Sequence, residues 1–320
     1  MRSRLVVSAG VLGAVIPLTL APGGLYLYSA GVADALAVLS IVLLSGMAGQ
    51  LSLAQGAFMG VGALTAAHLS SDAGVPFLVA VPLGALAAVP VGLAAAVPAL
   101  RLRGIQLAIV TLAWGQLLQR LFFDAPANGG SLGGVPLHRP ALFAGDVAYC
   151  ELELVVLAGA VAVVSLLGGR RSGRNLTLLR ESETAALAAG IDLTRLKLTA
   201  FALSAALAGL AGGLLAGIGG VATPGDFTPF DSVGLLAVAV IGGLQSAAGA
   251  VAGGLLRACG PSWIGHLPVV GSADSAALVF GAALVLGLIT APRGIAGQLR
   301  DAERGVVRAL ARRREARSAD

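Results

Sequence analysis

Residues 198–225 read LTAFALSAALAGLAGGLLAGIGGVATPG and contain no Asp, Glu, Lys or Arg. A helix needs about 20 apolar residues to cross the hydrocarbon core of a bilayer, so this stretch is long enough for one crossing. Small residues at four-residue spacing let membrane helices approach closely, and they form two neighbouring rows here. The rows are Ser204, Ala208, Gly212, Ala216 and Gly220, and Ala205, Gly209, Gly213 and Gly217. The stretch therefore predicts a transmembrane helix that packs closely against its neighbours.

The rest of the chain has a similar composition. Of 320 residues, 57% are hydrophobic and 12% are charged, whereas a soluble domain carries roughly 25% charged residues. The 46 glycines and the 4% of aromatic residues are typical of packed membrane helices. This composition excludes a disordered chain, a collagen, a disulfide scaffold and a nucleic-acid-binding domain.

Charge-free stretches recur along the chain and predict an all-α polytopic membrane protein of about 8–10 transmembrane helices, some broken or re-entrant. The start resembles a secretory signal, but the apolar stretch continues to Leu27, which favours an uncleaved first span. A pair of short helices that enters and leaves on the outer side is expected in 232–256, and a loop in 258–273. The expected spans are 5–27, 32–47, 53–70, 76–98, 104–123, 152–168, 198–221 and 274–291.

Basic residues give the orientation, because Lys and Arg accumulate in cytoplasmic loops. They cluster at Arg2 and Arg4, at Arg101 and Arg103, in 170–197 and in 293–317, while the loops between these clusters are acidic or mixed. Both termini are therefore predicted to be cytoplasmic. The net charge of +5 follows from this topology and needs no nucleic acid as partner. The predicted organisation is a single transmembrane domain over 1–297, with a cytoplasmic loop at 169–197 and an external segment at 124–150, and a basic cytoplasmic tail at 298–320.

Two glycine-rich breaks interrupt the predicted helices. One is GMAGQLSLAQG at 46–56 and the other is GGLQSAAGAVAGG at 242–254. Irregular backbone at membrane depth is tolerated only where it is buried in protein or lines a water-filled cavity. Paired breaks of this kind in two halves of a chain indicate an internal repeat and a central pathway.

The sequence carries no energy source of its own. Lys197 is the only lysine, and no phosphate-binding loop surrounds it. No acidic residue is expected in the middle of a span, since Asp34 lies at a predicted end, and the three histidines are expected to be structural or solvated. No residues have metal-ligand spacing, and no catalytic triad can be assembled, so neither a metal, a cofactor nor an enzyme is predicted. Cys150 and Cys259 fall on the predicted outer side, where a disulfide and two unrelated thiols both stay open.

The cytoplasmic loop contains LRESETAALAAGID at 179–192. Ser182 is a good N-cap, Glu183 suits the positive end of a helix, and Gly190 is a natural terminator. The segment predicts a two-turn helix on the membrane surface, and an ordinary charged turn is the alternative.

At this point the sequence resembles the branched-chain amino acid ABC transporter permease family, the LivM-like subunits. The most specific match is RESETAALAAGIDLTRLKLTAFALSAALAGLAG at 180–212. Four further stretches match in order, namely GMAGQLSLAQGAFMGVGA (46–63), LRLRGIQLAIVTLAWG (100–115), NGGSLGG (128–134) and AVIGGLQSAAG (239–249). Members of the family often have Gly-His where this chain has Ala54 and Gln55.

The resemblance implies a permease subunit of an ABC importer, embedded in the lipid bilayer of a bacterial cell membrane, for branched-chain or other small amino acids. Its implied partners are a second permease subunit, two cytoplasmic ATPase subunits that bind the ATP, and an extracytoplasmic solute-binding protein. Permeases of the same class for urea, amides or sugars, a passive channel and a polytopic membrane enzyme are the alternatives. The substrate itself is not fixed by the sequence.

The resemblance also implies two sets of functional residues. The short helix would couple to the ATPase through an apolar face of Ala185, Ala186 and Ala189, and the breaks would line the translocation path. Close helix packing for the glycines and interhelical hydrogen bonds for the polar side chains are equally open interpretations. The coupling set is Arg180, Glu181, Glu183, Ala185, Ala186, Ala189 and Gly190. The path set is Gly46, Gly49, Gln50, Ser52, Gln55, Gly56, Gly242, Gly243, Gln245 and Ser246.

Overall fold

The computed structural model describes residue 17, residues 21–128 and 133–265, and residues 279, 281 and 282. Most of these residues are helical, and the sheet found among them pairs two short antiparallel strands, β1 (Val135–Pro136) and β2 (Val221–Ala222). The α-helices are α2 (Pro22–Ile41), α3 (Gln55–Ser71), α4 (Phe77–Ala99), α5 (Gly104–Leu118), α6 (Asp146–Gly169), α7 (Arg171–Glu181), α8 (Glu183–Ala188), α9 (Leu193–Gly219), α10 (Pro229–Gly242) and α11 (Ala247–Gly265). The shorter helical turns are η2 (Val42–Met47), η3 (Gln119–Phe123), η4 (Pro126–Asn128), η6 (Ala141–Phe143) and η7 (Pro224–Phe227).

The predicted all-α membrane class is confirmed. Within the described ranges, five helices are long and apolar enough to cross a membrane. Most of the predicted spans 5–27 and 274–291 lies outside the described residues, as do both termini, so the number of spans in the whole chain and the sides of the termini stay predictions. The five helices are Gly23–Met47, Phe77–Ala99, Gly104–Phe123, Asp146–Gly169 and Leu193–Gly219.

The expected boundary between the first two spans is wrong. A continuous helix runs from Pro22 through η2 to Met47, so the residues on either side of the expected break at 28–31 belong to one element. Residues 28–31 contain no proline and no charge, and the hydroxyl of Ser29 donates to Glu153 on α6. Nothing in this segment therefore interrupts the helix. As a consequence Asp34 lies inside the span and not at its end.

Two other helices are longer than expected. Helix α6 begins at Asp146, whose carboxylate favours the positive start of a helix, so residues 146–150 of the segment predicted to be external are helical. Helix α11 continues to Gly265, so residues 258–265, which were expected to form a loop, are helical. The hydroxyl of Ser262 donates to the carbonyl of Cys259 within this last turn.

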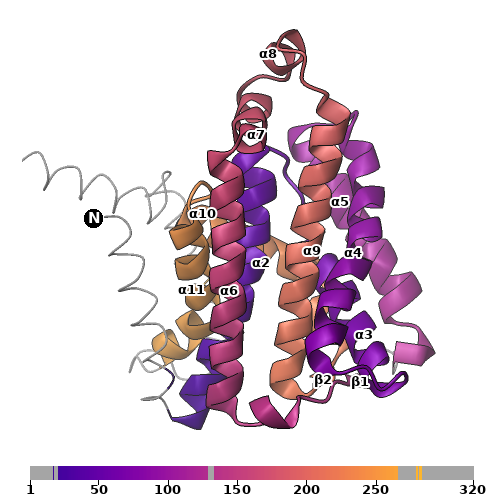
Figure 1. The fold of residues 1–320 in the computed structure, drawn as a ribbon, viewed down its shortest axis with the longest axis vertical. Coiled ribbons are helices and arrows are strands. Elements are labelled where there is room, and N and C mark those ends of the chain that lie inside the picture. Colours follow the sequence, from indigo (N-terminus) through magenta and orange to yellow (C-terminus); the bar gives the residue numbers. More distant parts are fainter. Residues whose placement is uncertain (1–16, 18–20, 129–132, 266–278, 280, 283–320) are drawn as a thin grey trace, which may run out of the picture.

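Helix α9 lies at the centre of the bundle, beside α2, α3 and α4 (Figure 1). The close packing expected from its small residues is confirmed. A methyl group at Gly212 would overlap the carbonyl oxygen of Met59 on α3, so only glycine allows this approach. The rows of small residues on α9 thus let the long apolar helices of the core pack backbone against backbone.

Both expected breaks are present. Residues 48–54 are not helical and join η2 to α3, and residues 243–246 form the turn between α10 and α11, a helix pair at the expected place, although α11 is longer than the expected short helix. Helix α4 packs along α9 much as α11 packs along α2. If the two sets of helices are compared as repeats, the segment that corresponds to 48–54 is 220–228 and not the break at 242–254. Both 48–54 and 220–228 lead from a long helix into a shorter one.

The two ends of the bundle carry different charges. Helices α7 and α8 stand at the upper end in Figure 1, and β1 and β2 lie at the lower end. An ion pair between Arg103 and Glu183 shows that both arginine-rich loops share the upper end, which we call the basic end. The pairing of β1 with β2 places the segment after α5 at the opposite end. This separation is the one that the positive-inside rule predicts.

Candidate coupling and translocation site

The predicted short helix is present as α8, and both of its ends are closed by local hydrogen bonds. The hydroxyl of Ser182 accepts from the backbone N–H of Ala185 at 3.2 Å. At the other end Gly190 has a φ of 75°, in the left-handed region that favours glycine, and its N–H bonds the carbonyl of Leu187 at 2.9 Å. Six residues would not hold a helix alone, so the caps and the surrounding contacts specify it.

Helix α8 presents a mixed, mostly exposed surface at the basic end. Ala185 and Ala189 are exposed, and the side chain of Leu187 is 59% exposed. Ala186 is fully buried, so the expected docking face of three alanines is wrong at this position. The reason is geometric: the turn that follows α8 folds beneath it, and the N–H of Ile191 bonds the carbonyl of Ala186 at 3.0 Å. The exposed apolar surface is therefore formed by Ala185, Leu187, Ala188 and Ala189.

Glu183 points inward from α8, whereas Glu181, at the end of α7, is exposed. The two carboxylate oxygens of Glu183 meet different cations, with Lys197 Nζ at 2.9 Å and Arg103 Nη2 at 2.5 Å. Lys197 also donates to the carbonyl of Ala99 at 3.0 Å. Lys197 and Arg103 were not predicted as members of this site. A single lysine at the start of a long apolar helix was the sequence signal that could have pointed to it.

Arg180 does not lie on the exposed surface with α8. Its Nη1 donates to the carbonyl of Gly46 at 2.7 Å, and its side chain packs against Gly49. Gly49 has a φ of 69°, so the backbone turns sharply at this contact. The last turn of α7 is thereby attached to the start of the 48–54 break.

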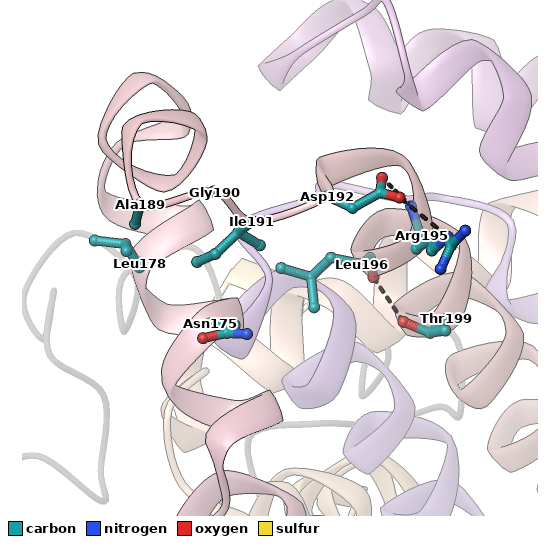
Figure 2. A pocket seen from close by; sticks show the side chains of 9 residues that line it. All are labelled: Asn175, Leu178, Ala189, Gly190, Ile191, Asp192, Arg195, Leu196 and Thr199. Carbon is teal, nitrogen blue, oxygen red and sulfur yellow. Dashed lines mark hydrogen bonds and ion pairs between the residues drawn. The ribbon is translucent and has the colours of Figure 1, made fainter.

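An open groove lies between α7, the turn after α8 and the first turn of α9. Its volume is about 600 Å³. Figure 2 shows Ala189, Gly190 and Ile191 leading from α8 toward α9, where Asp192 and Arg195 form an ion pair at 3.1 Å. The groove and the exposed side chains of α8 together form one irregular surface at the basic end.

The 48–54 break is held inside the bundle by polar side chains. Gln55 accepts a hydrogen bond from Ser40 at 3.3 Å and donates one to Ser204 at 3.2 Å. The hydroxyl of Ser204 in turn donates to the carbonyl of Ser40 at 3.0 Å. The start of α3 is thus tied to α2 and α9 at one point, and Gln55 is fully buried there.

Backbone N–H groups at the end of this break donate to side chains of other helices. The N–H of Gly56 donates to Ser232 on α10 at 2.9 Å, and the N–H of Leu53 donates to Thr111 on α5 at 2.9 Å. Ser52 is buried, and its hydroxyl accepts from the N–H of Ala54 at 3.3 Å. Side chains from several helices therefore replace the hydrogen bonds that a regular helix would have made.

The two expected breaks lie next to each other. A methyl group at Gly46 would overlap the carbonyl oxygen of Leu244, in the turn between α10 and α11. Behind this turn Gly242 packs against Gly249, and the hydroxyl of Ser246 accepts from the N–H of Gly249 at 3.4 Å. Gly46 and Gly242 are thus points of close backbone approach.

The four remaining residues of the path set differ in their surroundings. Gln50 is buried, and its Oε1 has no hydrogen-bond partner among the described residues. Gly49 and Gln245 are exposed, and Gly243 has a φ of 110° at the turn. Gly243 is buried, and both of its backbone groups are hydrogen-bonded.

Charged residues inside the bundle were missed. Asp34, in the middle of the first span, pairs with Arg257 Nη1 at 2.7 Å, and Arg257 Nη2 reaches Asp231 at 2.9 Å. The expectation that no acidic residue lies within a span is wrong here, because α2 begins earlier than its hydropathy indicated. Glu153 on α6 is also fully buried and accepts a hydrogen bond from Ser29. These contacts join α2 to α6, α10 and α11.

Neither cysteine forms a disulfide: Cys150 is buried on α6 and Cys259 lies partly buried on α11. Over the described ranges, no group of three His, Cys, Asp or Glu side chains lies close enough together to hold a metal ion.

The chain matches one family model and is similar to two curated proteins. Residues 25–288 match the family model described as branched-chain amino acid transport system / permease component. The chain is 33% identical over 236 residues to the high-affinity branched-chain amino acid transport system permease protein LivM of Salmonella typhimurium, which covers 65% of this chain and 56% of that protein. It is 32% identical to the protein of the same name from Escherichia coli strain K12, with the same two shares. The chain thus spans about half the length of the curated relatives it matches. No solved structure matches it.

Proposed function

Because the chain belongs to the family of permease components of branched-chain amino acid transport systems, we propose that it is a permease subunit of an ABC importer for branched-chain amino acids. It works with a second permease subunit and two ATPase subunits at the basic end. A solute-binding protein delivers the amino acid at the opposite end. The full sequence has no phosphate-binding loop, so the energy of ATP enters through a contact with another chain.

The observation that carries the proposal is α8. It is capped at both ends and exposed at the basic end, and it stands at the extremity of the bundle in Figure 1. A short helix of this kind, with Leu187 exposed beside the groove of Figure 2, offers a rigid apolar contact to a cytoplasmic partner. Such contacts need a central apolar anchor with a polar rim, and Glu181, Asp192 and Arg195 supply the rim.

The path set divides into two roles in this proposal. Gly46, Ser52, Gln55, Gly56, Gly242 and Ser246 hold the broken segments in place through close packing and hydrogen bonds. Gly49 and Gln245 are exposed and Gln50 keeps an unpaired Oε1, so these three face the solute, while Gly243, which is buried with both backbone groups hydrogen-bonded, forms the turn. The first group supports the path, and the second group lines it.

The test of the proposal uses the chain expressed together with its ATPase, its second permease subunit and its solute-binding protein. Leu187→Asp places a charge in the apolar contact, and we expect co-purification of the ATPase and uptake of radiolabelled leucine to be lost together. Leu187→Met keeps an apolar side chain of similar size and serves as the control. An ATPase that never co-purifies with the unaltered protein, or leucine uptake without any ATPase, contradicts the proposal. Uptake of urea or ribose in place of leucine would assign a different substrate of the same transporter class.

A further inference from the structure

Helix α8 has few attachments to the rest of the bundle. Ala186 is its one fully buried side chain, and the preceding helix α7 supplies most of its other neighbours. Glu183, in its first turn, is the residue that reaches the transmembrane helices directly. The side chain of Glu183 is 11% exposed, although it begins a helix that is otherwise largely open to solvent.

The two ion pairs of Glu183 differ in their surroundings. The pair with Lys197 is enclosed, since the Lys197 side chain is 3% exposed and a second acceptor, the carbonyl of Ala99, fixes its ammonium group. The pair with Arg103 lies at the surface, where the Arg103 side chain is 68% exposed. A buried ion pair is costly to separate, whereas an exposed pair opens and closes at little cost. Glu183 therefore has one permanent attachment and one releasable attachment.

The two cations belong to helices of very different packing. Lys197 lies on α9, the central helix of the bundle. Arg103 directly precedes α5, in which only Leu107, Thr111 and Gly115 are buried. Gly104, which begins α5, has a φ of 57°, a conformation that allows the chain to change direction there. Glu183 thus lies between a firmly packed helix and the loosely packed start of another.

We infer that Glu183 is a positioning residue that passes displacement of α8 to α5 through Arg103, with Lys197 as the fixed pivot. The inference rests on the proposed function, in which an ATPase moves α8. Movement of α8 about the Lys197 contact opens or closes the Arg103 contact and so shifts the first turn of α5. The hydroxyl of Thr111, on the same helix, accepts a hydrogen bond from the N–H of Leu53, so a shift of α5 also displaces the 48–54 break.

A purely structural role would have different consequences. If the three charges only stabilised the fold, loss of Arg103 would lower the amount of folded protein and of bound ATPase together. In the positioning role, α8 keeps its caps and its Lys197 contact, so the ATPase stays bound while its hydrolysis no longer drives transport.

The experiment compares Arg103→Gln with two controls. Arg101→Gln removes a neighbouring exposed arginine for which the described residues show no side-chain partner, and Arg103→Lys keeps the charge. Each variant is purified with its ATPase and second permease, reconstituted in liposomes with the solute-binding protein supplied, and assayed for bound ATPase and for leucine transported per ATP hydrolysed. We expect Arg103→Gln to keep the ATPase but to lower this ratio about tenfold, within the range of known coupling energies. Arg103→Lys and Arg101→Gln should stay close to the unaltered protein.

Amide hydrogen exchange on the purified permease alone gives a second readout that needs no partner. The amides of residues 107–110, the first in α5 that have intrahelical acceptors, should exchange faster in Arg103→Gln than in Arg101→Gln. A transport ratio within twofold of the unaltered protein, equal loss of ATPase and transport, or unchanged exchange at the start of α5 each overturns the inference. An ATPase that does not bind even the unaltered protein overturns the proposed function instead, and the exchange measurement then decides whether Arg103 holds α5.

Discussion

Arg180 donates from Nη1 to the carbonyl oxygen of Gly46 across 2.7 Å, although 134 positions separate the two residues in the sequence. Gly46 in turn lies against the carbonyl of Leu244. The helix before α8 is thereby joined to both breaks, and it reaches them without passing through the transmembrane core. The basic end of the molecule thus contains a short physical route from the proposed ATPase contact to the proposed path.

Arg180→Ala should destabilise this junction. The buried carbonyl of Gly46 loses its charged partner, and an unsatisfied buried acceptor costs about 1–3 kcal/mol. We expect a lower temperature of thermal unfolding for the detergent-purified protein and reduced leucine uptake. Arg171→Ala changes an exposed arginine on the same helix and should leave both values unchanged. Equal effects of the two substitutions would show that the contact with Gly46 contributes nothing particular.

Gly46→Ala should be far more damaging than its size suggests. The added methyl group would overlap the carbonyl oxygen of Leu244, which is backbone and cannot rotate away. Overpacking of this kind costs about 1–3 kcal/mol or more, so the two breaks should separate or the protein should fail to accumulate. Gly159→Ala on α6 meets nothing within 4 Å and provides the control. Fluorescence-detected size-exclusion chromatography measures the folded fraction of both, and similar profiles would contradict the structure at this contact.

The ion pairs within the bundle predict an order among three substitutions. Arg257→Leu leaves Asp34 and Asp231 without their shared cation, so it should cost the most, about 3–5 kcal/mol as for other broken buried pairs. Asp34→Asn keeps an acceptor for Arg257 and should cost less. Arg120→Leu changes an exposed arginine whose partner Asp124 is 3.8 Å away, and it should have little effect. Thermal unfolding of the three purified variants gives the order directly, and a milder effect of Arg257→Leu than of Asp34→Asn would refute it.

Features set by neighbouring residues were predictable from the sequence. The caps of α8 depend on Ser182 and Gly190, which lie within one turn of the groups they bond. The close packing of α9 follows from its own rows of small residues, whatever the partner helix is. The 48–54 break also follows from local glycines and polar side chains, since no regular helix tolerates that composition at membrane depth.

Features that depend on distant residues were not predictable. Lys197 and Ala99 are 98 positions apart, and Arg257 and Asp34 are 223 apart, so no local pattern indicates that they meet. Hydropathy also placed Asp34 at a helix end, because a single charge looks like a boundary until its buried partner is known. The side of α8 that faces inward depends on how α7 and α9 pack against it, and the residues of α8 alone do not specify these contacts.

Substitutions on the buried side and on the exposed side of α8 should have different effects on the permease. Ala186 is fully buried beneath the turn at Ile191, so Ala186→Asp would place a carboxylate without a partner inside the chain and disrupt α8 itself. Ala185 is exposed, so Ala185→Asp should leave the permease intact and weaken only the contact with the ATPase. Ala185→Ser, which is small and neutral, serves as the control for the exposed position.

The measurement has two parts, because the two substitutions should fail in different ways. Amide hydrogen exchange across 183–191 in the isolated permease should rise strongly in Ala186→Asp and stay unchanged in Ala185→Asp, since only the first breaks contacts within the chain. Co-purification of the ATPase should fall in both. If Ala185→Asp retains the ATPase and full leucine uptake, then the exposed face of α8 is not the docking surface. If Ala186→Asp leaves exchange at 183–191 unchanged, then Ala186 is not packed as the structure shows.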